Sequence, residues 1–210
     1  PIEIFLSIFI VSYSLKIIKS IHNKIIKILF RKYKFIQSVI LDFLKTRIGL
    51  LDSVVLSGGE ATVHNVIPIC KEIKKLGLKI KLDTNATNLP QIKKLIELNL
   101  LDYIAIDFKA PKYKFKEIVG VDMYDNTIKT IQYLISIDFT FELRTTINKS
   151  LLDENDINSM IETISNLGYK NIYYLQNFLE TSSNIGNISK SSNIDKSKIN
   201  TQNLTIQYRN

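Results

Sequence analysis

Cysteine is almost absent from this sequence, since Cys70 is the only one among 210 residues. One thiol cannot form a disulfide within the chain, and nothing else points to an oxidising compartment. Cys70 falls in a segment with helical periodicity, where a small buried apolar side chain is its expected role. We therefore expect a cytoplasmic protein, and the length allows one substantial hydrophobic core in one or at most two domains.

Long uninterrupted apolar runs are also missing. The best candidate, residues 4–18, is broken by three serines, a tyrosine and Lys16, whereas a spanning helix needs about 20 apolar residues. Glu3 precedes this run at the place where a signal peptide carries positive charge. The segment therefore fits a buried strand that leads into the first helix, with a surface-associated amphipathic segment as the alternative.

Positive charge is in excess but is not concentrated. The chain has 28 Lys and Arg against 20 Asp and Glu, a formal net charge of +8, which attracts nucleotides, nucleic acids and acidic membranes without specificity. The basic residues are scattered among isoleucines and asparagines, so a dedicated nucleic-acid surface is not expected. The phosphate or carboxylate of a small cofactor would be a sufficient partner for this charge.

Short β-branched runs alternate with segments of helical period along most of the chain. This alternation predicts parallel strands joined by right-handed crossovers, hence an α/β fold, and about six units in this length favour a partial (β/α)6 barrel over a complete eightfold one. The predicted strands are Ile2–Phe9, Ser53–Leu56, Lys79–Leu82, Asp102–Ile106, Phe139–Leu143 and Asn171–Leu175. The predicted helices are Ile25–Lys45, Val66–Leu76, Pro90–Leu98, Asn126–Ile137 and Glu154–Leu167, with Gly77 and Gly168 as carboxyl caps.

Polar residues gather where these strands end. In a parallel barrel all strand carboxyl ends open on the same mouth, so residues far apart in the sequence converge there. Glycine backbone can approach a ligand closely, a glutamate can accept from an ammonium, and lysine and arginine can hold a carboxylate. The pattern predicts a site for an amino acid joined to a nucleoside. Its candidate residues are Gly58, Gly59, Glu60, Asp83, Asn85, Asp107, Lys109 and Arg144.

Each of these clusters also has a plain structural interpretation. The Gly-Gly-Glu stretch could be a turn, Asp83–Asn85 could cap the next helix, and Lys109 could solvate a loop before Pro111. Their joint placement at successive strand ends is what favours binding.

Several segments in a fixed order carry a family resemblance: VVLSGGEAT, KIKLDTNAT, DYIAIDFKAP, EIVGVD, ELRTTI and NIYYLQNF. Between about Phe35 and Phe178 the chain resembles the radical S-adenosylmethionine (SAM) superfamily, and within it the enzymes that activate glycyl radical enzymes, above all the activator of anaerobic ribonucleoside-triphosphate reductase. The resemblance implies a TIM-like partial barrel that binds SAM, with such a reductase as its protein partner. The scattered charge and the short apolar runs predict no specific nucleic-acid partner and no transmembrane span.

The resemblance also implies roles for the candidate residues. The Gly-Gly-Glu segment, Gly58 to Glu60, would bind the methionine amino group, and Ala61 is compatible with the residue that usually follows. Asp83 and Asn85 would lie near the ribose and methionine, and the remaining candidates, Asp107, Lys109 and Arg144, would line the pocket. Ala86 stands where the family usually has glycine.

The family chemistry depends on a 4Fe-4S cluster held by three cysteines spaced Cys-x3-Cys-x2-Cys after the first strand. Such clusters are normally held by thiolates. His22 is no substitute, because it has no partner at ligand spacing. In one alignment the three cysteine positions are occupied by Tyr13, Ile17 and Ser20, and in another by Ser14, Ile18 and Ile21. Neither alignment supplies a thiol.

Three functional hypotheses follow. The resemblance implies an activase, in which a reduced cluster cleaves SAM and the deoxyadenosyl radical takes hydrogen from a glycine of the partner, with the missing ligands indicating a degenerate member. The alternatives are a SAM-binding protein without a cluster and a basic module associated with membranes or nucleic acids. We expect a barrel domain over residues 1–178 and a Ser/Asn/Lys-rich tail over 179–210, loosely ordered with a possible final strand in LTIQYRN.

Overall fold

A computed structural model describes residues 38, 40–57, 59–180, 188–189, 191–201 and 204–209 of the chain. It divides into two compact units, which we describe separately. The first consists of Pro1–Asp83 with Lys93–Asp102, and the second of Thr84–Ile92 with Tyr103–Asn210. The predicted strand Ile2–Phe9 and most of the predicted helix Ile25–Lys45 lie outside the described residues, although residues 40–45 are helical.

The first unit contains the parallel pair β1 (Ser53–Leu56) and β2 (Lys79–Thr84), in register from Ser53↔Lys79 to Leu56↔Leu82. They are joined through the 3-10 turn η2 (Ala61–Val63) and the helix α2 (Ile67–Lys75). Alternate strand residues are buried, because successive side chains of a strand point to opposite faces. The helix α3 (Leu89–Glu97) begins in the second unit and ends in the first.

Asp102 links three parts of the first unit. Its carboxylate accepts two hydrogen bonds of 2.9 Å from Lys74 Nζ on α2, and one of 2.6 Å from the backbone N–H of Ile80 on β2. A carboxylate that serves both a side chain and a strand backbone fixes the distance between helix and strand.

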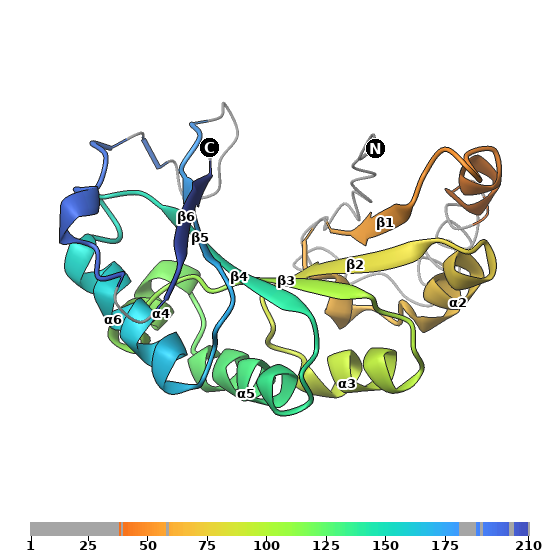
Figure 1. Cartoon of the computed structure of the whole chain (residues 1–210), viewed down its shortest axis with the longest axis horizontal. Helices are drawn as coiled ribbons and strands as arrows, with labels where there is room; N and C mark the ends of the chain where they lie inside the picture. The colour runs from red at the N-terminus through yellow and green to blue at the C-terminus, as the bar shows by residue number, and fades with distance from the viewer. Residues whose placement is uncertain are drawn as a thin grey trace, which may run out of the picture. The chain divides into compact units, whose positions relative to one another are not determined.

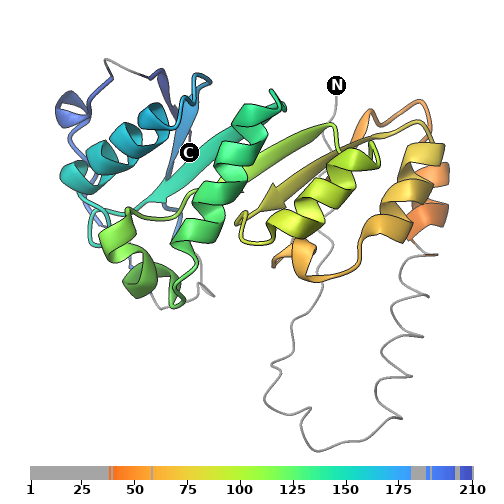
Figure 2. The same cartoon turned by 90° about the horizontal axis from the view of Figure 1, so that it is seen from below.

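The second unit contains β3 (Tyr103–Asp107), β4 (Phe141–Ile147), β5 (Tyr173–Asn177) and β6 (Ile206–Arg209), which pair in parallel in sequence order. The helices of this unit, α4 (Lys112–Val119), α5 (Tyr124–Ser136) and α6 (Glu154–Asn166), lie on one face of this sheet (Figures 1 and 2). The core between helices and sheet is formed by fully buried residues, among them Ile104, Ile106, Ile131, Leu143, Ile157 and Leu175.

The other face of the second unit's sheet is polar. The alternation of side chains places Asp107, Glu142, Arg144, Tyr174 and Gln176 away from the helices, and all of these except Glu142 are half-buried. A sheet that is apolar on one face and polar on the other needs a helical layer on one side only. The polar face is therefore available for chemistry.

The helix α4 is not among the helices predicted from the sequence, which assigns no element between Ile106 and Asn126. Pro111 occupies the N-cap position and Gly120, with φ of 82°, ends the helix. Phe115 points into the core. Proline before a helix and glycine after it are ordinary helix-boundary signals, so the sequence contains enough information to predict α4.

The helix α4 is tied to the start of α6 through Asp156, which is buried. Asp156 accepts from Lys114 Nζ at 2.6 Å and from Tyr113 Oη at 2.8 Å, and it also forms a capping box with Asp153. Burial acts to raise the pKa of this carboxyl, but the hydrogen bonds, that from Lys114 above all, lower it overall. The bonds from Lys114 and Tyr113 to Asp156 thus join α4 to α6 on the same face of the sheet.

The other predicted elements agree with the structure to within a few residues. The predicted strand Phe139–Leu143 begins two residues before β4 and ends four residues early, because the polar residues Arg144, Thr145 and Thr146 continue the strand. Gly77 and Gly168 follow their helices with φ of 79° and 87°, which is the left-handed conformation expected of a carboxyl cap. Among the described residues, no helix has the length and apolar character needed to span a bilayer.

Candidate functional site

In the first unit, the predicted residues Gly59 and Glu60 follow β1, and Gly58 lies outside the described residues. Gly59 has φ of 65°, a conformation that strains any residue with a β-carbon. Glu60 is the N-cap of η2, where its Oε1 accepts from the backbone N–H of Thr62 at 3.1 Å and from Thr62 Oγ1 at 2.6 Å. This carboxylate therefore holds the shape of the loop, a role that the sequence did not reveal.

Asp83, near the end of β2, shares a strand face with Lys81. The Lys81 Nζ lies 3.7 Å from Asp83 Oδ1, and both side chains are largely buried. The attraction between the opposite charges offsets part of the free energy lost when these groups leave water. A ligand that binds Asp83 would therefore share its carboxylate with the Lys81 ammonium.

In the second unit, Asn85 organises the turn that precedes α3. Its Oδ1 accepts from the backbone N–H of Thr87 at 3.0 Å and from Thr87 Oγ1 at 2.7 Å, which is an Asx turn. Its carbonyl accepts from Thr127 Oγ1 of α5 at 3.1 Å. Asn85 is thus positioned by two separate segments of the unit.

Ala86 keeps the turn shape for which the resembling family uses glycine. It has φ of 60° and is fully buried. Its N–H donates to Thr84 Oγ1 at 3.0 Å and its carbonyl accepts from Thr130 Oγ1 at 2.7 Å. The left-handed conformation costs an alanine roughly 1 kcal/mol, and these hydrogen bonds hold it there.

Three further predicted residues of the second unit lie together at the carboxyl ends of β3 and β4. Asp107 and Arg144 are register partners, and Arg144 Nε donates to Asp107 Oδ1 at 2.6 Å. Lys109 Nζ lies 3.7 Å from Asp107 Oδ2. The side chain of Arg144 is 15% exposed and that of Asp107 is 37% exposed. Two cations against one anion leave a net positive site that can accept a carboxylate or phosphate.

A second arginine pair on the same face of the sheet was not predicted. Arg209 of β6 donates to Glu142 of β4 through Nη2 at 3.0 Å and Nη1 at 3.3 Å, and Tyr103 Oη donates to the same carboxylate at 3.3 Å. The Arg209 guanidinium also stacks on the Tyr174 ring, with Cζ 3.2 Å from its centroid. The side chain of Glu142 is only 6% exposed.

The pKa values of this second pair reflect its burial. Burial and the adjacent Glu142 carboxylate raise the pKa of Tyr103 to about 12. Burial acts to lower the pKa of Arg209, but the hydrogen bond to Glu142, the charge of that carboxylate and the contact with Tyr174 together offset this and raise it. A buried carboxylate with three donors is satisfied, so this group joins the last strand to the sheet.

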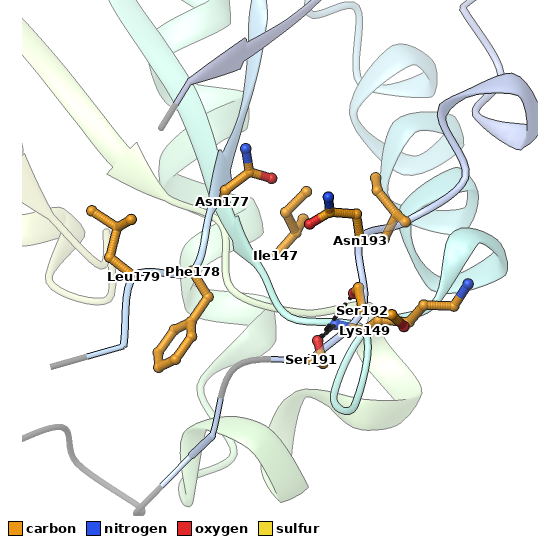
Figure 3. Close-up of a pocket in the computed structure, with 9 residues that line it drawn as sticks. Ile147, Lys149, Asn177, Phe178, Leu179, Ser191, Ser192 and Asn193 are labelled. Carbon is orange, nitrogen blue, oxygen red and sulfur yellow. Dashed lines mark hydrogen bonds between the residues drawn. The ribbon is translucent and has the colours of Figure 1, made fainter.

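A cavity of about 390 Å³ opens at the carboxyl ends of β4 and β5, and we call it the β4–β5 cavity (Figure 3). In the view of Figure 3, the Ile147 side chain lies between the carboxamides of Asn177 and Asn193. Such a mixture of apolar and amide groups suits a neutral planar group with hydrogen-bonding edges. The lining residues are Ile147, Lys149, Asn177, Phe178, Leu179, Ser191, Ser192, Asn193 and Ile194.

The residues of this chain do not fit an iron–sulfur cluster. Such clusters require several thiolates, whereas Cys70 is the only cysteine and is fully buried in α2. Burial raises its pKa to about 12, which keeps the thiol protonated. Within the described part of the chain, no group of three or more His, Cys, Asp or Glu side chains could hold a metal ion. The sequence positions aligned with the family cysteines lie outside the described residues.

Comparison with known sequences places these features in a family context. The model of the "Radical SAM superfamily" matches residues 23–172. A protein of Methanocaldococcus jannaschii, provisionally named glycyl-radical enzyme activating enzyme MJ1227, is 34% identical over 134 residues, which is 60% of this chain and 55% of that protein. A provisionally named GTP 3′,8-cyclase of Saccharolobus islandicus is 28% identical over 130 residues, which is 60% of this chain and 42% of that protein. The chain thus spans about half the length of these relatives.

Solved structures show the same fold. A domain of pyruvate-formate lyase-activating enzyme from Bacteroides vulgatus superposes with a TM-score of 0.53 at 20% identity, covering 60% of this chain and 80% of that one. Native anSMEcpe with bound AdoMet gives a TM-score of 0.58 at 16% identity, covering 73% and 46%. The predicted α/β fold of the partial TIM-like barrel type is therefore confirmed.

Proposed function

Because the chain belongs to the radical SAM superfamily, we propose that it binds SAM at the carboxyl ends of the parallel strands of its second unit. The observation that carries the proposal is the net positive arrangement of Arg144 and Lys109 around Asp107. Arg144 is held in place by its 2.6 Å bond to Asp107, and a guanidinium fixed in this way is suited to a carboxylate. The methionine carboxylate of SAM is the group that it would hold.

The β4–β5 cavity supports the same proposal. It lies at the ends of β4 and β5, and Ile147 on its wall is three residues after Arg144 on the same strand. The two side chains point to opposite faces of the sheet, so a ligand that contacts both passes over the strand ends. Three residues of a strand span about 10 Å, a distance that a nucleoside joined to an amino acid can bridge. Asn85, whose side chain is fixed by Thr87, is the candidate for a ribose hydroxyl.

The predicted residues of the first unit, Gly58, Gly59, Glu60 and Asp83, remain candidates for the methionine amino group and the ribose. Their convergence with the residues of the second unit stays a prediction. A loss of SAM affinity in Glu60→Gln would support it, because this change removes the charge of the carboxylate and leaves its capping oxygen in place.

The proposal is tested by calorimetric titration with SAM and with decarboxylated SAM. The protein should bind SAM at least about tenfold more tightly than decarboxylated SAM, because a charge-assisted hydrogen bond contributes about 1.5–3 kcal/mol. Lys109→Gln should reduce that preference, and Lys112→Gln, which removes the same charge from an exposed residue paired with Asp125, should preserve it. Equal affinity for the two ligands, or no heat with SAM, would refute the proposal.

A second candidate function is activation of a glycyl radical enzyme such as anaerobic ribonucleoside-triphosphate reductase. The 34% identity to the Methanocaldococcus protein favours it. Its radical step needs a cluster for which this chain supplies one buried thiol, so we derive no step through that group. Anaerobic incubation with iron and sulfide provides the test: a brown protein that forms 5′-deoxyadenosine from SAM under reduction would support activation, and a colourless protein would reject it. The cytoplasmic location stays a prediction.

A further inference from the structure

The described residues 191–201, which we call the C-terminal arm, form one wall of the β4–β5 cavity. Ser191, Ser192, Asn193 and Ile194 contribute to that wall. The arm supplies Asn193, and Figure 3 shows this side chain beside the cavity, across Ile147 from Asn177 of β5. One side of the cavity therefore depends on a segment outside the strands.

Two side chains of α6 hold the arm in place. Glu154 Oε1 accepts from the backbone N–H of Asp195 at 2.6 Å, and the same oxygen lies 2.9 Å from Lys149 Nζ. Asn158 clamps the arm further along, since its Nδ2 donates to the carbonyl of Lys198 at 2.8 Å and its Oδ1 accepts from the N–H of Asn200 at 2.8 Å.

Other contacts fix the arm next to the cavity. The N–H of Lys149 donates to Ser191 Oγ at 2.7 Å, and Asn148 Nδ2 donates to the carbonyl of Ser189 at 2.9 Å. Ile194 and Ile199 are buried. The bonds to Ser191 and Asp195 restrain the chain on either side of Asn193, and so they help to position its carboxamide at the cavity. The bond from Asp195, with the adjacent Lys149, also lowers the pKa of Glu154 to about 2, which keeps this acceptor ionised at neutral pH.

We propose that Glu154 and Asn158 are positioning residues for the β4–β5 cavity, and that the C-terminal arm must be docked on α6 for the cavity to bind its ligand. Neither residue lines the cavity, so both act through Asn193 and its neighbours. The ligand-binding half of the inference rests on the proposed binding of SAM. Affinity then falls in proportion to the fraction of molecules whose arm is docked.

Hydrogen exchange of peptides that cover residues 191–200 measures docking without any ligand. Asn158→Ala removes two hydrogen bonds and should raise exchange of the arm about tenfold. Asn166→Ala is the matched control, because it makes the same substitution at an exposed residue of the same helix. Unchanged exchange in Asn158→Ala would overturn the positioning role, whether or not SAM binds.

SAM titration measures the coupling. The double variant Glu154→Ala with Asn158→Ala should bind SAM about tenfold more weakly than the natural protein. Its melting temperature should stay close to that of Asn166→Ala. In the natural protein, saturating SAM should slow hydrogen exchange of the arm. Affinity equal to that of the control would overturn the coupling. If the natural sequence gives no heat with SAM while Asn158→Ala still frees the arm, the positioning role stands and the proposed SAM binding fails.

Discussion

Two arginine–carboxylate pairs lie on the same polar face of one sheet, yet they differ in burial. In the Arg144–Asp107 pair the carboxylate is 37% exposed and a second cation, Lys109, stands beside it. In the Arg209–Glu142 pair the carboxylate is 6% exposed and is enclosed by a guanidinium and a phenol. The first pair keeps a net positive charge, whereas the second is internally satisfied and fastens β6 to β4 across the intervening strand β5. We propose that the same chemistry serves ligand binding in the first pair and folding in the second.

The largest expected effect comes from opening the buried pair. Arg209→Met leaves the Glu142 carboxylate buried with only Tyr103 as a donor among the partners identified above, so we expect the free energy of unfolding to fall by about 2–3 kcal/mol. Urea denaturation measures it. Adding Glu142→Leu should restore much of the loss, because no buried charge then remains. A loss below about 0.5 kcal/mol would mean that the pair does not hold the strand.

A smaller effect is expected at the phenol of the same pair. Tyr103→Phe removes one hydrogen bond to Glu142 and should cost about 1 kcal/mol at neutral pH. The folded protein keeps the Tyr103 proton up to a pKa of about 12, compared with 10 for an ordinary tyrosine. Its contribution to stability is therefore complete below pH 10 and is lost between pH 10 and 12.

The natural protein should consequently lose stability more steeply than Tyr103→Phe over that alkaline range, as followed by urea denaturation at several pH values. Parallel curves for the two proteins would show that Tyr103 titrates normally and is not enclosed with Glu142. The difference between the curves matters because other buried tyrosines contribute equally to both.

The turn at Ala86, which precedes α3, should be stabilised by a glycine. Ala86 has φ of 60°, so Ala86→Gly removes backbone strain of roughly 1 kcal/mol, partly offset by the greater freedom of glycine in the unfolded chain. We expect a net gain of about 0.5 kcal/mol, measured as a higher melting temperature. A decrease would indicate that the Ala86 methyl group packs well enough to outweigh the strain.

The smallest effect on stability is expected at the Arg144–Asp107 pair. Arg144→Gln breaks an ion pair whose carboxylate is 37% exposed, and ion pairs open to solvent contribute about 0–1 kcal/mol. Urea denaturation should therefore place this variant within about 1 kcal/mol of the natural protein. A loss as large as that of Arg209→Met would remove the distinction between the two pairs.

Part of this picture follows from sequence alone. The family resemblance and the fold class are confirmed. In the part of the chain that the structure describes, the predicted strands and helices lie within a few residues of their expected positions, because β-branched runs and capping glycines are local signals. The placement of Asp107, Lys109 and Arg144 together follows from the rule that parallel strands end on one edge. Their role as ligand-binding residues stays a prediction.

The contacts that sequence could not supply are long-range. Glu142 and Arg209 are 67 residues apart, and no local pattern pairs a carboxylate with one particular arginine. The segment before β6 has the composition of a loosely ordered linker, yet its described residues 191–201 contact Glu154 and Asn158 of α6. Isolated asparagines and serines carry little periodic signal, so their partners appear only in three dimensions.

The central claim is that only one of the two arginines serves the ligand. Calorimetric titration of SAM into Arg144→Gln and Arg209→Gln, at a temperature where both are folded, tests it most directly. We predict that Arg144→Gln weakens binding about tenfold or more, as expected for a lost charge-assisted bond, and that Arg209→Gln changes it by less than about threefold. Equal losses in the two variants, or binding that survives Arg144→Gln unchanged, would contradict the account.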